Sequence, residues 1–590
     1  MELKVRVSFY RKERMRILKR QARITLAGMI AVILIIVIVI IGLVVKKYTP
    51  GREVMSLDEY YEVAEDEALI LFHSGIYEKR ALYEDGEAYL DYQTVVDRIN
   101  DHFYWDENEN LLLCTTPGQV IKAEAESKDY YVNKSKTSLK YPIVKLKDAQ
   151  VFVAIDYVEL FSDVKYRFLE KPNRLLIDCD WGTEYMYSET AEATQIRVEP
   201  DIKSKILEEL PQKSRLVYVD AGKEAEDDFS KVMSQEGVVG YVKKKHLNKA
   251  FYEKLESDYK KEEYSHIVRD YKINMVWHQV FSESQNEDLL NQLSSTKGVT
   301  TVSPTWFCVE SAEGDISSLA SEAYVTRAHN AGVEVWAMIK DFPDEGEAVD
   351  MKQLLSWTSK REHLINEIIS YAIQLNLDGI NVDFEKITEA AAPHYIEFLR
   401  ELSVKCRNNG IILSVDNYVP SAYTAYYNRS AQGEVVDYFI TMAYDEHYAG
   451  GETAGSVASI SYVEDAVQNT IAEVPKERVI IGIPFFTRLW HEEHVGDEVE
   501  ITSEAYSMSG AQQHLKEQGV EAEWDKETRQ YYAEYTSADG DVVNKIWLEE
   551  ERSMEAKMKA IKKGGAAGVA CWKLGLEKES VWDIIMKYNN

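Results

Sequence analysis

Eight short apolar runs, each about as long as a buried strand, recur in the C-terminal half of the chain. They read, in order, "INMVWHQV", "TTVSPTWF", "VEVWAMI", "DGINVDFE", "IILSVD", "DYFITMAY", "VIIGIPFF" and "GVACWKL". Most are separated by helical patterns, as where Leu364, Ile368 and Ala372 recur at helical spacing. Eight buried strands alternating with helices predict a (β/α)8 TIM barrel over residues 266–590. A longer alternating segment between the seventh and eighth runs predicts a small α+β insertion.

The fourth run, within "LDGINVDFEKI", concentrates polar groups in an apolar setting. Side chains alternate along a strand, so Asn381, Asp383 and Glu385 share one face. Glu385 falls at the C-terminal end of the strand, where the active sites of such barrels lie. Two carboxylates buried together raise the pKa of one of them, as a general acid requires. The pattern therefore predicts an acid–base site rather than a solvated acidic loop, because apolar residues flank each acid.

One acid next to these residues breaks the alternation of that strand. Asp378 lies on the opposite parity from Asn381 and Asp383, so it is expected to be structural. A hydrogen bond to the turn at Gly379 is the role we expect for it.

The run "DGINVDFE" resembles the signature of glycoside hydrolase family 18, the chitinase-like family. Three further motifs follow in the order of that family. "MAYDEH" supplies Met442, Tyr444 and Asp445, "GIPFFTRLW" resembles the seventh-strand segment, and "GVACWKLG" places Trp572 at the tryptophan under the bound sugar. The resemblance covers roughly residues 268–590 and is strongest to the branch of spore-cortex and cell-wall N-acetylglucosaminidases.

The resemblance implies a substrate-assisted retaining mechanism, without a cofactor or metal. Glu385 would protonate the leaving glycosidic oxygen, and the N-acetyl carbonyl of the sugar would attack the anomeric carbon. Asp383 would orient the acetamido group and Tyr444 would hydrogen-bond its oxygen. Substrate contacts are expected from Asn381 and from the later motifs: Met442, Asp445 and Trp572.

One departure from the family pattern concerns the proton-sharing chain. Asn381 stands where the family has its second aspartate, and an amide cannot take up a proton as a carboxylate can. The departure bears on rate and pH optimum more than on reaction type. The alternative function is a non-catalytic glycan-binding surface protein, a chitinase-like lectin. A third is a scaffold that binds a partner protein through residues 50–185.

The N-terminal segment predicts a membrane anchor. Residues 1–23 hold nine Lys/Arg against two Glu, and residues 24–45 hold no charged residue. A helix over 24–45 spans roughly 33 Å at about 1.5 Å per residue, enough for a bilayer core. A cleaved signal peptide is the alternative, but its apolar core would be shorter. The basic side is expected to stay in the cytoplasm, which puts the catalytic domain outside the cell membrane.

Two smaller modules are expected between the anchor and the barrel. Residues 50–185 contain a weak α+β repeat in which each copy ends in a hairpin, and they resemble the copper amine oxidase N-terminal-like module. Residues 190–250 show short alternating strands and resemble the bacterial SH3 domain, a small β-barrel. Either a spacer or a wall-binding role suits this second module.

The net charge limits the classes of binding partner, and the cysteine content bears on disulfide bonds and metal sites. The net charge of −32 argues against nucleic acid as a partner. The family resemblance implies a cell-wall glycan as the partner, either peptidoglycan or a chitin-like polymer, and the N-terminal segment implies the membrane. The five cysteines are few, odd in number and widely spaced, so no disulfide framework or metal site is indicated. A bridge between Cys114 and Cys179 stays open at this stage.

Overall fold

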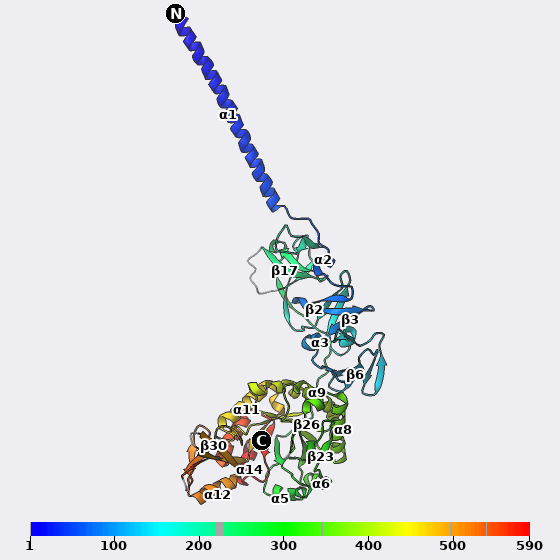
Figure 1. The fold of residues 1–590 in the computed structure, drawn as a ribbon, viewed down its shortest axis with the longest axis vertical. Coiled ribbons are helices and arrows are strands. Elements are labelled where there is room, and N and C mark those ends of the chain that lie inside the picture. Colours follow the sequence, from blue (N-terminus) through cyan, green and yellow to red (C-terminus); the bar gives the residue numbers. More distant parts are fainter. Residues whose placement is uncertain (1, 220–227, 344–345, 496–497, 538–539, 590) are drawn as a thin grey trace. The chain divides into compact units, whose positions relative to one another are not determined.

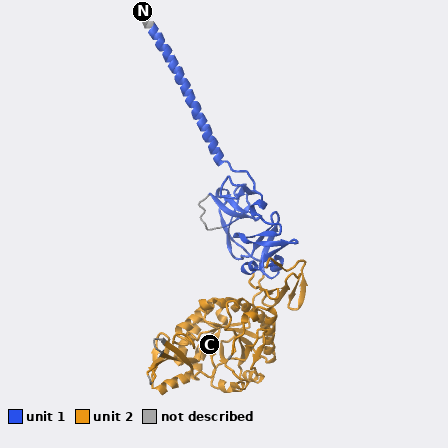
Figure 2. Cartoon of the chain, viewed as in Figure 1, with its two compact units in different colours: residues 1–99, 150–259 blue, residues 100–149, 260–590 orange. Residues whose placement is uncertain are grey.

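The computed structural model describes residues 2–219, 228–343, 346–495, 498–537 and 540–589. These residues form two compact units (Figure 2): residues 1–99 with 150–259, called unit 1, and residues 100–149 with 260–590, called unit 2. The expected module at residues 50–185 thus contributes chain to both units. The elements of both are labelled in Figure 1.

A closed barrel of eight parallel strands forms the centre of unit 2, as the sequence predicts (Figure 1). The strands pair in chain order, and β20 with β34 completes the ring. The strands are β20 (Ile273–His278), β21 (Thr301–Pro304), β24 (Glu334–Lys340), β25 (Gly379–Asp383), β26 (Ile412–Tyr418), β27 (Tyr438–Met442), β28 (Val479–Pro484) and β34 (Gly568–Trp572). The helices between them include α6 (Glu322–Asn330), α8 (Thr358–Gln374), α9 (Ala392–Asn409), α11 (Ile460–Glu473), α13 (Glu551–Gly564) and α14 (Ser580–Tyr588).

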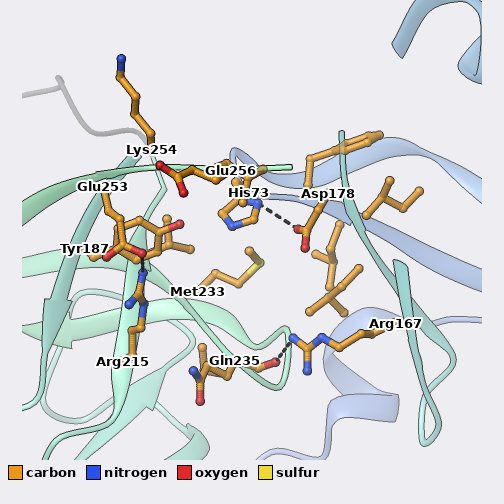
Figure 3. Close-up of a pocket in the computed structure, with 17 residues that line it drawn as sticks. His73, Arg167, Asp178, Tyr187, Arg215, Met233, Gln235, Glu253, Lys254 and Glu256 are labelled. Carbon is orange, nitrogen blue, oxygen red and sulfur yellow. Dashed lines mark hydrogen bonds and ion pairs between the residues drawn. The ribbon is translucent and has the colours of Figure 1, made fainter. Parts of the chain in front are cut away.

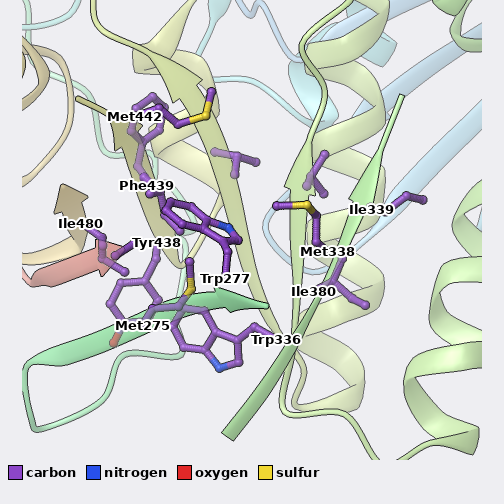
Figure 4. Close-up of a cluster of buried hydrophobic side chains, with 14 of the residues drawn as sticks. Met275, Trp277, Trp336, Met338, Ile339, Ile380, Tyr438, Phe439, Met442 and Ile480 are labelled. Atoms are coloured by element: carbon purple, nitrogen blue, oxygen red, sulfur yellow. The ribbon is translucent and has the colours of Figure 1, made fainter. Parts of the chain in front are cut away.

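Two tryptophans fill much of the barrel interior, and glycines make room for them. Trp277 and Trp336 are fully buried among the apolar side chains of the strands (Figure 4). A Cβ added at Gly379 would lie 2.9 Å from two ring atoms of Trp336, and one at Gly482 would lie 3.2 Å from the ring of Trp277. Large and small residues therefore face each other across the barrel, which lets so many bulky rings pack without voids.

The insertion after the seventh barrel strand is a five-stranded sheet with its own core, as predicted. Its elements are β29 (Phe486–Val495), β30 (Glu498–Ser507), α12 (Met508–Gln518), β31 (Glu523–Asp525), β32 (Gln530–Thr536) and β33 (Val542–Leu548). Leu489, Leu515 and Ile546 are among the residues of its separate hydrophobic cluster. The insertion begins directly after Phe485, so it extends the chain at the mouth end of the barrel.

A second sheet in unit 2 is built from residues 100–149 and packs on the barrel helices. It comprises β4 (Phe103–Asp106), β5 (Leu111–Thr115), β6 (Val120–Glu124), β7 (Asp129–Val132) and β8 (Ser135–Ser138). Asp106 accepts hydrogen bonds of 2.6 Å from both the backbone amide and the hydroxyl of Thr358, at the start of α8. Thr115 donates to Glu397 of α9 at 2.8 Å. Because these contacts are buried, this sheet belongs to the same folding unit as the barrel.

The two repeat copies have the same element order, but their hairpins belong to different units. The first runs β3 (Glu87–Asp91), α3 (Tyr92–Arg98), β4 and β5, and the second runs β10 (Gln150–Ala154), α4 (Ile155–Leu160), β11 (Lys165–Leu169) and β12 (Arg174–Asp178). Strands β3 and β10 pair with each other. The hairpin β11–β12 stays in unit 1 beside β1 (Glu67–Phe72), whereas β4–β5 joins unit 2.

Unit 1 also contains a seven-stranded antiparallel sheet over residues 184–254. Its strands are β13 (Glu184–Glu189), β14 (Thr194–Arg197), β15 (Ile206–Leu210), β16 (Arg215–Tyr218), β17 (Phe229–Ser234), β18 (Val239–Lys243) and β19 (Phe251–Lys254). A cavity of about 630 Å³ lies between this sheet and the β1–β12 sheet (Figure 3). His73 and Asp178 form an ion pair of 3.2 Å beside it, and Arg167 donates to the backbone oxygen of Gln235 at 2.8 Å.

The N-terminus is one long helix, α1 (Glu2–Tyr48), which extends beyond the apolar segment predicted at 24–45. Among the described residues it is the helix long and apolar enough to cross a membrane, judged by length and composition. All five cysteines are free thiols, so the bridge between Cys114 and Cys179 does not form; the two lie in different units.

We predict that Gly379→Ala destabilises the barrel. The added methyl group meets the ring of Trp336 and the backbone oxygen of Ile412, and neither can retreat inside a closed barrel. We expect a loss of about 2 kcal/mol in the free energy of unfolding, measured by urea titration of tryptophan fluorescence. The matched control is Gly118→Ala, whose Cβ would meet open space. Equal midpoints for the two variants would contradict the tight fit at Gly379.

Candidate active site

The polar residues of the fourth barrel strand converge at the C-terminal mouth of the barrel. Asn381 and Asp383 of β25 face the interior and are buried, whereas Glu385 follows the strand end and is partly exposed. The alternation in "DGINVDFE" predicts the burial of Asn381 and Asp383 on one face, whereas Glu385 lies two residues beyond the end of the strand rather than on it. A buried acid beneath a partly exposed one gives a site that substrate can reach at one carboxyl only.

The amide of Asn381 is held by four hydrogen bonds. Its oxygen accepts from Trp277 Nε1 at 3.0 Å and from Ser303 Oγ at 3.1 Å. Its nitrogen donates to Ser414 Oγ at 3.1 Å and to Asp416 Oδ1 at 2.8 Å. A primary amide has two acceptor and two donor positions, so the hydrogen-bonding capacity of Asn381 is fully used.

Asp416 of β26 brings a second buried carboxyl next to Asp383. Burial raises the pKa of Asp416 to about 8, and the charge of Glu385 adds to that effect, while the hydrogen bond from Asn381 opposes it. Burial and the nearby charges of Glu385 and Asp416 also raise the pKa of Asp383 well above its usual value. Like charges this close cannot all ionise in a dry interior, so the cluster holds protons at neutral pH.

Glu385 is fixed by a phenol and by its own backbone. The hydroxyl of Tyr418, at the end of β26, donates to Glu385 Oε2 at 2.6 Å. Asp341, which follows β24, accepts from the backbone amides of Glu385 and Lys386 at 2.9 Å each. Burial raises the pKa of Asp341 to about 6 despite these two amides. The loop carrying Glu385 is therefore anchored on both neighbouring strands.

Aromatic rings border the acids on the opposite wall. The rings of Tyr444 and Trp277 meet edge to face with centroids 6.3 Å apart, and Trp277 lies 5.8 Å from Trp572. Trp572, at the end of β34, is partly exposed, and Met442 is buried beneath the mouth. Trp572 can therefore present an apolar face to a ligand, whereas Trp277 supports it from below.

A model of the family described as glycosyl hydrolases family 18 matches residues 238–577, more than half of the chain. The chain belongs to this family. A second model, the copper amine oxidase N-terminal domain, matches residues 75–171. The closed parallel barrel with its acids at the C-terminal mouth is thus that of a family 18 glycosidase.

Relatives in sequence come from Bacillus species. The chain is 27% identical over 272 residues to YdhD of Bacillus subtilis (strain 168), a protein described as a sporulation-specific glycosylase, and the match covers 45% of this chain and 63% of that protein. It is 25% identical over 237 residues to the cortical fragment-lytic enzyme of the same organism, covering 39% and 54%. The chain therefore spans between half and two thirds of the length of these curated relatives.

A solved structure shares the barrel fold. The C-terminal domain of a protein described as a chitinase, from Desulfitobacterium hafniense DCB-2, superimposes with a TM-score of 0.50 at 22% identity, covering 54% of this chain and all of that one. The spore cortex-lytic enzyme SleL of Bacillus megaterium QM B1551 gives a TM-score of 0.48 at 21% identity, covering 54% and 75%.

Asp445 of this family 18 barrel lies beside the mouth in a left-handed backbone conformation, with φ of 56°. Its carboxyl is 3.8 Å from Arg488 Nε on β29. Burial raises the pKa of Asp445, and the guanidinium of Arg488 partly offsets this. The insertion thereby contributes a cation to the edge of the site.

Asp378 and Gly379 lie at the other end of β25 from the acids. Asp378 Oδ2 accepts from the backbone amide of Val335 at 2.8 Å and pairs with His329 Nε2 at 2.8 Å. These contacts tie β25 to β24 and to α6, which precedes β24. Their distance along the strand separates them from the chemistry at the mouth.

Three polar residues at the mouth escaped the sequence analysis: Asp341, Asp416 and Tyr418. Each stands at the C-terminal end of a predicted strand or just after it, in "MIKDF" and "SVDNY". The general rule that barrel sites lie at strand ends would have indicated them. No cluster of metal-ligating side chains occurs within the residues that the structure describes.

We predict that Tyr418→Phe lowers turnover because Glu385 loses its phenolic donor. A hydrogen bond to a charged group is worth about 2 kcal/mol, so we expect roughly a 10- to 50-fold fall in kcat. Initial rates of glycan cleavage measure it. Tyr423→Phe is the matched control, since that side chain is 92% exposed. Unchanged kcat in Tyr418→Phe would show that the 2.6 Å contact does not serve the reaction.

The buried acids predict that stability falls as pH rises. Asp416 has a folded pKa of about 8 against an ordinary value of 3.8, so the folded chain keeps a proton that the unfolded chain releases between these values. Stability then declines by about 1.4 kcal/mol per pH unit for this group across pH 4–8. Asp416→Asn removes the ionisation, so we expect its thermal midpoint to fall less between pH 5 and pH 8. Parallel melting curves for both proteins would contradict this.

Proposed function

We propose that this glycosidase is a membrane-anchored, extracytoplasmic enzyme that cleaves β-1,4 bonds in polymers containing N-acetylglucosamine, with peptidoglycan preferred over chitin. Glu385 protonates the glycosidic oxygen of the leaving sugar, and the acetamido carbonyl of the substrate attacks the anomeric carbon. Glu385 then removes a proton from the incoming water, so the anomeric configuration is retained.

The observation that carries the proposal is the placement of Glu385 just beyond the end of β25, two residues after buried Asp383. Glu385 is exposed enough to reach a glycosidic oxygen and is held by Tyr418 at 2.6 Å. Asp383 lies deeper, where a carboxyl can face the positive charge that develops on the acetamido group. The phenol of Tyr444 lines the same mouth and suits the acetamido oxygen.

The apolar ring of Trp572 supports a sugar substrate. Its partly exposed face lies next to Trp277, and the apolar face of a pyranose ring packs well on an indole. Met442, Asp445 and Asn381 complete the surroundings, although Asn381 acts from below the surface. The peptidoglycan preference rests on the relatives, among which is the cortical fragment-lytic enzyme of Bacillus subtilis.

The location outside the membrane rests on the N-terminal helix and its flanking charges. The apolar part of α1 exceeds the length that a signal peptide needs, and nine basic residues precede it. An anchored enzyme would act on wall polymer close to the membrane. The seven-stranded sheet of residues 184–254, expected as an SH3 domain, would serve as a spacer or a wall contact.

The test is hydrolysis by the full-length chain purified in detergent, with Glu385→Gln beside it. We expect new reducing ends from purified peptidoglycan, fewer from chitin oligomers, and a loss of at least 1,000-fold in Glu385→Gln. The matched control is Glu464→Gln, a substitution at an exposed position on α11 that should retain full activity. Mass spectrometry of the products identifies the sugar at the new end.

Two outcomes would overturn the proposal. Cleavage that survives in Glu385→Gln would move the acid role to another residue. Glycan binding without products from either polymer, in the wild type as in the variant, would replace the enzyme by a chitinase-like lectin.

A further inference from the structure

Two carboxyl oxygens are buried at the barrel mouth without a hydrogen-bond partner among the described residues. They are Asp383 Oδ1 on β25 and Asp416 Oδ2 on β26. An unpaired buried oxygen of this kind is costly, and a proton held between two such groups removes the cost. Both side chains are at most 4% exposed, so bulk water does not solvate them.

The strand register places these two acids side by side. Strands β25 and β26 are parallel, with Asn381 beside Ser414 and Val382 beside Val415. The next pair in this register is Asp383 and Asp416, on strands that lie about 4.8 Å apart. The two carboxyls interact, since the charge of Asp416 contributes to raising the pKa of Asp383.

Asn381 cannot act as the proton partner of Asp383. Its oxygen is taken by Trp277 and Ser303, and its two N–H groups are taken by Ser414 and Asp416. An amide in this state neither accepts a proton nor has a lone pair left to bond Asp383. It does fix Asp416, because its N–H bond to Oδ1 leaves Oδ2 as the oxygen that can carry a proton.

We propose that Asp416 is the proton-sharing partner of Asp383, so that the carboxyl missing at position 381 is supplied from the neighbouring strand. The pair holds one proton. At rest this proton is shared between the two carboxyls. When Asp383 turns to the positively charged acetamido group, the proton stays on Asp416 Oδ2 and any bond it made to Asp383 breaks. Asp383 then carries the negative charge, and the net charge of the pair is unchanged. Asp416 is a positioning residue, since it acts through Asp383.

Among the described residues, no cation acts on the pKa of Asp416 in a way that would hold this acid ionised. Charge effects on pKa link Asp416 to four groups. They are Asp383 of β25, Glu385 just after it, Tyr444 after β27, and Tyr395 of α9. All are acids or phenols, whose ionisation would oppose that of Asp416. The cation Lys340 instead lowers the pKa of Asp383 and so favours the ionised form of that acid. The asymmetry lets Asp416 keep the shared proton when Asp383 carries the negative charge.

The decisive experiment exchanges the two residues. Asp416→Asn keeps an oxygen that accepts from Asn381 but cannot take up a proton. We expect it to lower kcat about 100-fold on the polymer that the wild type cleaves, with KM little changed. The exchange variant Asn381→Asp/Asp416→Asn restores a proton-sharing carboxyl beside Asp383, and we expect it to recover at least tenfold over Asp416→Asn. A structural role for Asp416 would give no such recovery.

An infrared titration tests the pair without activity. A buried protonated carboxyl absorbs apart from ionised ones, so the wild type should show such a band at pH 7. We expect it to fade with a midpoint near pH 8, because burial raises the pKa of Asp416 to about 8, and to be lost or displaced in Asp416→Asn. The inference rests on the proposed hydrolysis for its role, but this band does not. If the wild type shows this band but hydrolyses neither polymer, the proposed function is refuted and the proton-sharing pair is not.

The result that would overturn the inference is an Asp416→Asn protein with wild-type kcat and pH profile. So would a wild-type spectrum without a protonated carboxyl at pH 7. If Asp416→Asn fails to fold, the wild-type spectrum and the exchange variant still decide, since the latter keeps one acid and one amide in the same places.

Discussion

The Asn381 amide holds the mouth of the barrel together. Its four hydrogen bonds join β25 to Trp277 of β20, to Ser303 of β21 and to Ser414 and Asp416 of β26. These strands surround the interior, so one side chain links several walls of the barrel. Because each position of the amide is used, the orientation of the amide is fixed, and so is that of Asp416, whose Oδ1 accepts one of its N–H bonds.

Several acids with raised pKa values surround Asn381 at the mouth of the barrel. Asp341, Asp383, Glu385 and Asp416 gather at the ends of three neighbouring strands, and burial raises the pKa of three of them. Such a cluster costs stability, since each acid prefers water to a dry interior. The proposed function explains its retention, because buried carboxyls with raised pKa values can hold a proton at rest and exchange it during a reaction. The close packing of tryptophans against glycines in the barrel core stabilises the fold and offsets the cost of burying these acids.

Outside the barrel, strand pairing rather than order along the chain decides which sheet a segment joins. The two repeat copies begin as neighbours, since β3 pairs with β10, and then separate. One hairpin completes the sheet of unit 1, and the other continues into a sheet that docks on α8 and α9 through buried contacts of Asp106 and Thr115. The catalytic unit thus includes residues far upstream of its barrel.

The sequence by itself determined the eight barrel strands, the insertion after the seventh, the apolar N-terminal helix and the family. It determined these because hydrophobic periodicity and the run "DGINVDFE" are local signals. Tertiary structure alone decided which residues meet Asp383. Asp416 lies 33 positions further along the chain, and only the register of β25 with β26 brings it alongside. The same holds for Tyr418 and Asp341, whose contacts with Glu385 depend on strand ends closing into a ring. Parallel pairing joins residues distant in sequence, so no local pattern could assign these partners.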